Sequence, residues 1–199
     1  MNILDNFVQG FRQLVPVHQM QVLSWDVMQR GQFMSMSSVV ETPSFAIARP
    51  VIRLVGMTGS VRLGLASFVA EHVGYIFCRH PWQFLIMAII GSGHPSASGA
   101  MQGMLTTVGD RVGLAQGELQ SALSLSRHIG RILSPTFWTA VFETGMRYGH
   151  PSCLYWAAAV IQSINLLLSM GLQFSVLEEE ARRSTDDDQP SSAERLSAK

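Results

Sequence analysis

The chain has 199 residues, of which 47% are hydrophobic and only 14% are charged, and its formal net charge is zero. Soluble domains usually carry about a quarter charged residues, so this composition favours lipid over water. The balanced charge gives no electrostatic reason to expect nucleic-acid binding, and two cysteines, Cys78 and Cys153, provide neither a disulfide framework nor a metal site.

The N-terminal segment, residues 1–38, opens with an apolar pattern. Between Ile3 and Val15 the apolar residues recur three and four apart, as on one face of a helix, and Pro16 ends the pattern. Two interpretations stay open for this stretch: a short amphipathic helix lying in a membrane interface, or a segment without stable structure. The rest of the segment has no clear period.

Residues 39–173 form the predicted transmembrane domain. Its first candidate span, residues 39–57, is a weak one because charged side chains near a bilayer centre are costly and this stretch carries Glu41, Arg49 and Arg53. The next candidate, Val61–Cys78, is about long enough to cross a bilayer. It would need a wet or paired environment for Glu71 and His72 in its interior.

Two long stretches without charge carry most of the membrane signal. Each covers 30 positions without Asp, Glu, Lys or Arg, His80–Gly109 and Tyr148–Leu177. About 20 mostly apolar residues suffice to cross the hydrocarbon core of a bilayer, so we expect spans over Trp82–Val108 and Ser152–Leu172. With a further helix over Glu118–Phe142, the prediction is an all-α, multi-pass membrane protein with four clear spans and one weak span.

Small residues follow the apolar start of the first charge-free stretch. Gly99 and Gly103 are four apart, a spacing that lets two helices approach closely in lipid, so we expect them to pack against another helix. His94 and Pro95 interrupt the same span. Interrupted helices contact substrate in some transporters, but this pair is equally consistent with a simple kink.

Candidate functional residues lie in three of the predicted spans. Glu71 with His72 could relay protons, or it could pair two helices. Arg127 and Arg131 share one helix face. They could bind an anionic group, pair with Glu71, or reflect relaxed selection against buried charge. Gln120 near a helix end is either a packing residue or a ligand contact. No motif for an enzyme, a cofactor or a metal is present.

The C-terminal segment, residues 174–199, is dense in charge and is predicted to be a disordered tail in water. Arginines near span ends are more numerous on one predicted side of the membrane than on the other. Since positive charge concentrates on the cytoplasmic side, the tail and the loop at 109–118 are expected to be cytoplasmic.

From about Ala48 to Leu168 the chain resembles the C-terminal part of a major facilitator superfamily transporter, of the tetracycline-resistance type of drug:proton antiporter. Four pieces of the sequence carry this resemblance: the Arg-Pro-Val-Ile-Arg-Leu-Val-Gly run at Arg49–Gly56, the small-residue run Gly91–Gly103 with Gln102 near its end, the Gln-Gly-x-Leu-Gln-x-x-Leu piece at Gln116–Leu123, and Pro135 with Phe137 after it.

The resemblance implies helices nine to twelve of a fold with about twelve helices in two halves, and proton-coupled efflux of a small organic molecule. The family's N-terminal half has no counterpart here, and Arg127 and Arg131 stand where family members usually have small or hydroxyl residues. Transport would therefore need a partner half or a homodimer. The alternatives left open are a membrane-embedded interaction or regulatory protein, a nonfunctional fragment, and a soluble helical protein.

Overall fold

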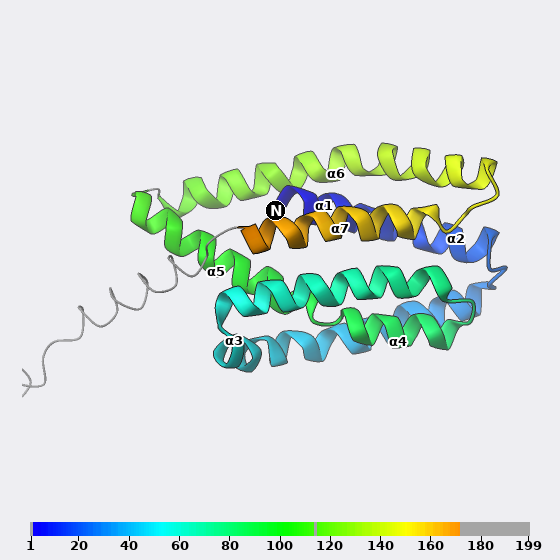
Figure 1. Ribbon diagram of the computed structural model, residues 1–199, viewed down its shortest axis with the longest axis horizontal. Coiled ribbons are helices and arrows are strands. Elements are labelled where there is room, and N and C mark those ends of the chain that lie inside the picture. The colour runs from blue at the N-terminus through cyan, green and yellow to red at the C-terminus, as the bar shows by residue number, and fades with distance from the viewer. Residues whose placement is uncertain (1, 114, 172–199) are drawn as a thin grey trace, which may run out of the picture.

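The computed structural model describes residues 2–113 and 115–171, and every regular element within them is helical, as predicted. The predicted tail at 174–199 lies outside the described residues. Most helices run along the long axis of an elongated bundle (Figure 1). The elements are α1 (Asn2–Gln9), the 3-10 turn η1 (Gly10–Gln13), α2 (Val15–Gln21), α3 (Val27–Phe77), α4 (Pro81–Gly91), α5 (His94–Val112), α6 (Gln116–Arg147) and α7 (Cys153–Gly171).

The longest element, α3, consists of two antiparallel limbs, residues 27–55 and 57–77 (Figure 1). Its start is fixed by Asp26 and Gln29, whose side chains each accept a hydrogen bond from the other residue's backbone N–H. The limbs meet at Gly56, where φ is 75°, a conformation that glycine adopts without the strain of a side chain. The weak span predicted at 39–57 therefore belongs to the first limb.

The first charge-free stretch is not one helix. The sequence predicts a span over Trp82–Val108, but α4 ends at Gly91 and α5 begins at His94. Small residues with little helix preference fill the break, and Pro95 occupies the first turn of α5, where a helix needs no backbone N–H donor. The interruption at His94 thus divides the stretch into two helices.

The apolar face at the start of the N-terminal segment packs against the bundle, where Val8, Phe11 and Val15 are buried. The carbonyl oxygen of Phe7 accepts hydrogen bonds from Ser134 Oγ and Trp138 Nε1 of α6, each at 2.8 Å. Phe11 is 2% exposed and packs in the core. The apolar face expected to lie in a membrane interface is therefore covered by protein, because these hydrogen bonds fix the segment to α6.

Aromatic rings make up much of the core. Tyr75 and Phe84 stack at 5.0 Å between ring centroids, and Tyr155 of α7 lies 5.6 Å from Tyr75. On the other side of Tyr155, Phe11 makes an edge contact at 6.2 Å. These rings join η1, α3, α4 and α7 into one packed unit.

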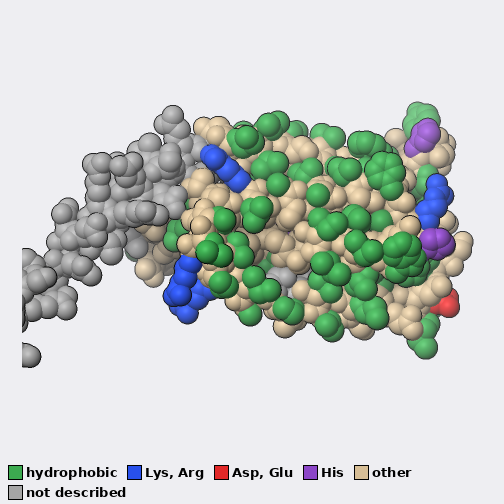
Figure 2. All heavy atoms as spheres, turned by 60° about the horizontal axis from the view of Figure 1, so that its bottom comes forward, with side chains coloured by type: hydrophobic (Ala, Val, Ile, Leu, Met, Phe, Trp, Pro, Cys, Tyr) green, Lys and Arg blue, Asp and Glu red, His purple; other side chains and the backbone are tan. Residues whose placement is uncertain are grey.

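The second half of α7 buries polar side chains and exposes apolar ones, the reverse of a helix in a soluble protein. Its fully buried side chains include the polar residues Gln162, Asn165 and Ser169. In contrast, Ile164 and Leu167 are 47% and 65% exposed. Figure 2 shows one face of the molecule, where hydrophobic side chains spread over the middle and charged or histidine side chains gather towards the two ends.

Within the described residues, two helical segments are long and apolar enough to cross a bilayer, Ala46–Phe77 and Cys153–Gly171, although the first of them includes the reversal of the chain at Gly56. This is fewer than the four clear spans predicted, because α4 has only 11 residues and α6 carries charged side chains along its length. Buried core helices of soluble proteins reach the same length and hydropathy, so this property alone does not decide between lipid and water.

Candidate functional site

A buried carboxylate lies at the centre of the candidate site. Glu71, in the second limb of α3, is 5% exposed. Its Oε1 accepts a hydrogen bond of 2.6 Å from the hydroxyl of Tyr75, four residues further along the same helix. Gly91 of α4 makes room for this carboxylate, since a Cβ at position 91 would collide with it. The sequence predicted Glu71 but not its tyrosine partner.

Two histidines and an arginine surround Phe68, one turn before Glu71. The ring of Phe68 lies 4.4 Å from the ring of His72 and 4.2 Å from the ring of His94. The guanidinium of Arg12 stands over Phe68, 5.9 Å from the ring centroid, at the distance of a cation–π contact. The structure thus brings His94 to the same part of the bundle as Glu71, as a packed side chain.

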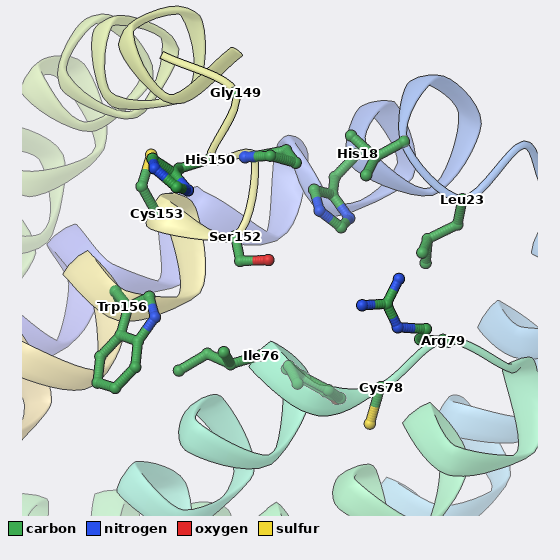
Figure 3. Close-up of a pocket in the computed structure, with 13 residues that line it drawn as sticks. His18, Leu23, Ile76, Cys78, Arg79, Gly149, His150, Ser152, Cys153 and Trp156 are labelled. Carbon is green, nitrogen blue, oxygen red and sulfur yellow. The ribbon is translucent and has the colours of Figure 1, made fainter.

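Two cavities lie next to these residues, and Tyr75 lines both of them. The smaller cavity, about 160 Å³, is lined by Arg12, Glu71 and Tyr75 among others. The larger one, about 420 Å³, lies between α2, the α3–α4 turn and the α6–α7 turn, and its lining includes His18, Tyr75 and Arg79 (Figure 3). Tyr75 therefore lines both a cavity that reaches the carboxylate and a wider cavity at one end of the bundle.

His18 is the buried imidazole of the larger cavity. It is 3% exposed, and burial lowers its pKa to about 4, because a charged imidazolium would lose its hydration there. Its Nδ1 lies 3.2 Å from the hydroxyl of Tyr155, and its Nε2 is buried without a hydrogen-bond partner. No sequence pattern pointed to this residue, because the stretch after Pro16 has no clear period.

The remaining predicted site residues lie elsewhere. Gln120, Arg127 and Arg131 are on α6, which packs on α1, whereas α3 packs mainly on α4, α5 and α7. Gln120 and Arg131 are exposed, and Arg127 is half-buried. The structure does not bring these arginines to Glu71, since α1 and α7 lie between α6 and α3 (Figure 1).

The two glycines predicted to pack helices do so only in part. Gly99 faces open space, and a Cβ at Gly103 would reach only the end of Met57, at 3.7 Å. The close approach of α3 and α5 occurs instead at Gly64, where an added Cβ would meet the Ala97 side chain and, at 2.7 Å, the carbonyl oxygen of Gly93. Small residues do join α5 to α3, as expected, but at Gly64 and Ala97.

Among residues 2–113 and 115–171, no three His, Cys, Asp or Glu side chains are grouped as metal ligands. Searches of protein-family models, of curated proteins and of solved structures each found no match for this chain. The chemistry of the site therefore rests on Glu71, Tyr75 and the two cavities.

Proposed function

We propose that this chain is an integral, multi-pass membrane protein whose helical bundle holds a path for proton-coupled transport. The observation that carries the proposal is the position of Glu71. Its carboxylate is buried where α3 packs on α4, accepts a hydrogen bond from Tyr75 and lines a cavity. Ionisable residues in the interior of membrane proteins are rare and mark proton relays or ion paths.

The reversed polarity of α7 supports the membrane environment. Full burial of a Leu or Ile side chain contributes about 1.5–3 kcal/mol to the stability of a soluble protein. In α7, Ile164 and Leu167 lack much of this burial, whereas Gln162 and Asn165 are buried. In lipid the arrangement is favourable, because the apolar side chains face the hydrocarbon while Asn165 and Gln162 bond to each other away from it. The 19 residues of α7 span about 28 Å, close to the thickness of that hydrocarbon layer.

In this path Glu71 carries the proton, and Tyr75 holds the Glu71 side chain in place by a hydrogen bond. The Tyr75 hydroxyl stabilises the ionised carboxylate by donating to Oε1. A proton taken up at the carboxylate neutralises Glu71, and its release at the other side of the bundle restores the charge. Arg12, which lines the same cavity, adds a fixed positive charge near the carboxylate.

The substrate class follows from the resemblance to tetracycline-type antiporters, which implies export of a small organic molecule in exchange for protons. A partner bundle, from a second copy or another chain, would complete alternating access. The α5–α6 turn and the kink at Gly56 share one end of the bundle, opposite the α3–α4 and α6–α7 turns (Figure 1). We assign the Gly56 end to the cytoplasm from the arginine distribution.

The test is tetracycline transport into proteoliposomes that contain the purified chain, driven by an imposed pH gradient. We expect uptake by the unmodified chain, loss of uptake in Glu71→Gln, and unchanged uptake in Glu143→Gln, which neutralises an exposed carboxylate of α6. Equal uptake by Glu71→Gln and the unmodified chain would contradict the assignment of Glu71. Absence of uptake by the unmodified chain would contradict transport by this chain.

A second candidate function, a membrane-embedded interaction protein, is favoured by one observation. Gly99 faces open space on α5, where another helix could approach closely. Energy transfer between donor- and acceptor-labelled chains in liposomes measures such association. Loss of the signal in Gly99→Leu would support this candidate, and an unchanged signal would exclude this face as the contact.

A further inference from the structure

We propose that the larger cavity at the end of the bundle binds a phosphate group, either as the headgroup of a phospholipid or as a free phosphate. The proposal does not depend on transport, because none of the groups that carry it belongs to the path through Glu71. It rests on the donors that converge on the cavity, on a buried nitrogen without a partner, and on the volume of the cavity.

Hydrogen-bond donors from three segments of the chain converge on the larger cavity. Figure 3 shows the guanidinium of Arg79, the ring of His18 and the hydroxyl of Ser152 approaching the middle of the cavity. His150 also lines it, and the described lining contains no carboxylate. Guanidinium groups match phosphate oxygens with two parallel hydrogen bonds, so Arg79 provides the main charge contact.

The hydrogen-bonding state of His18 makes it a donor to the ligand. Tyr155 is fully buried, and the described partner of its hydroxyl is Nδ1 of His18 at 3.2 Å. This contact fits the tautomer in which the phenol hydroxyl donates, Nδ1 accepts and the proton of the neutral ring stands on Nε2. That nitrogen is buried without a partner and lies in the cavity wall. A buried donor of this kind costs free energy until an acceptor arrives.

The start of α7 adds a favourable field. Ser152 precedes the first residue of this 19-residue helix, and both Ser152 and Cys153 line the cavity. The N-terminal end of a helix carries partial positive charge, which favours anions. Oxygens of a tetrahedral phosphate can meet donors from three directions, whereas a planar carboxylate presents only two oxygens.

The volume and place of the cavity fit a lipid headgroup as well as a free phosphate. About 420 Å³ exceeds the size of inorganic phosphate and leaves room for a glycerol or amine substituent. Some of the residues that line the cavity belong to the α3–α4 and α6–α7 turns, and these turns lie at one end of the bundle (Figure 1). In the membrane orientation proposed above, this end lies at the level of the lipid headgroups on the side opposite the cytoplasm.

The experiment is isothermal titration of the full chain, purified in dodecyl maltoside, with inorganic phosphate and separately with dihexanoyl phosphatidylglycerol. We expect saturable binding, weakened about tenfold or more in Arg79→Gln, as for loss of a charge-assisted hydrogen bond. Arg147→Gln, an exposed arginine outside the cavity lining, should bind as the unmodified chain does. Ser152→Ala should bind more weakly while keeping the fold.

The two probes distinguish the sources. Saturable binding of both probes, with mutual competition, identifies a site for free phosphate that also accepts headgroups. Binding of the lipid alone identifies a headgroup site. Binding of neither probe, or equal binding by the Arg79→Gln and Arg147→Gln variants, overturns the proposal.

Discussion

The hydroxyl of Tyr75 donates a hydrogen bond of 2.6 Å to Oε1 of Glu71, and both side chains are buried. The two residues are four apart in α3, so the helix itself sets their distance. This pair connects the core of the bundle to its cavities, because Glu71 lines the smaller cavity and Tyr75 lines both. A carboxylate held in this way depends on its donor, since burial without a hydrogen bond is costly.

Removal of the Tyr75 hydroxyl should therefore destabilise the bundle. Tyr75→Phe keeps the ring stacked on Phe84 but leaves Glu71 without this donor, at a cost of about 1–3 kcal/mol in the free energy of unfolding. Unfolding in detergent, followed by circular dichroism, measures the change. Tyr148→Phe is the matched control, because Tyr148 is 73% exposed. Equal stability of the two variants would show that the hydrogen bond contributes nothing.

The close approach of α3 and α5 predicts opposite effects for the same substitution at two glycines. Gly64→Ala should lower the free energy of unfolding by about 1–3 kcal/mol, because the new methyl group meets Ala97 and the carbonyl of Gly93. Gly99→Ala should raise it by about 0.5–1 kcal/mol, because Gly99 has open space and alanine favours a helix. A stabilising Gly64→Ala would contradict the described contact.

Burial of the N-terminal segment predicts a large effect at Phe11. Phe11→Ala should cost about 3–5 kcal/mol, since its ring is 2% exposed and contacts His72, Trp138 and Tyr155. Phe77→Ala serves as the control, because Phe77 is 71% exposed. If the segment lay on a membrane surface instead, Phe11→Ala would leave the thermal unfolding midpoint in detergent unchanged.

The buried imidazole of His18 predicts a stability that depends on pH. Its pKa of about 4 in the folded chain is below the usual value of 6.5, so the unfolded chain binds more protons between these values. Stability should be fully present above pH 6.5 and should fall as the pH drops towards 4, by up to about 3 kcal/mol from this group.

Thermal unfolding midpoints measured from pH 4 to pH 7 test this dependence. His18→Gln should flatten the profile, because the amide does not titrate. The matched variant His80→Gln changes an exposed side chain and should keep the profile of the unmodified chain. A His18→Gln profile as steep as that of the unmodified chain would assign the pH dependence to other groups.

The sequence predicted the helical class and several helix positions because charge and hydropathy act locally. The charge-free stretch from Tyr148 predicts α7 within a residue at each end, and Glu71 stands out as a carboxylate within an apolar run. The sequence prediction treated the first charge-free stretch as one span and missed its division into two helices before His94, although the glycines and Pro95 are visible in the sequence. The prediction also missed α2, because this helix has too few residues to show a helical period.

Other features depend on contacts that no local pattern contains. The N-terminal segment is held by hydrogen bonds from Ser134 and Trp138, more than 120 residues away in the chain. Its amphipathic pattern is the same for a core and for a membrane surface, so the pattern alone could not decide. The larger cavity likewise joins His18, Arg79 and Ser152 from three distant segments. Among the features of the candidate site, only the four-residue spacing of Glu71 and Tyr75 could have been recognised directly in the sequence.

The exposed apolar face of α7, which includes Ile164 and Leu167, should lie in lipid. Spin labels at Ile164→Cys and Leu167→Cys, in chains reconstituted into liposomes, report collisions with oxygen, which concentrates in the bilayer, and with a water-soluble nickel chelate. The two native cysteines are first replaced by serine, and a label at Tyr148→Cys serves as the water-exposed control. We predict high oxygen and low nickel accessibility at both α7 positions. Nickel accessibility there equal to that at position 148 would mean that this face lies in water, and would contradict the account.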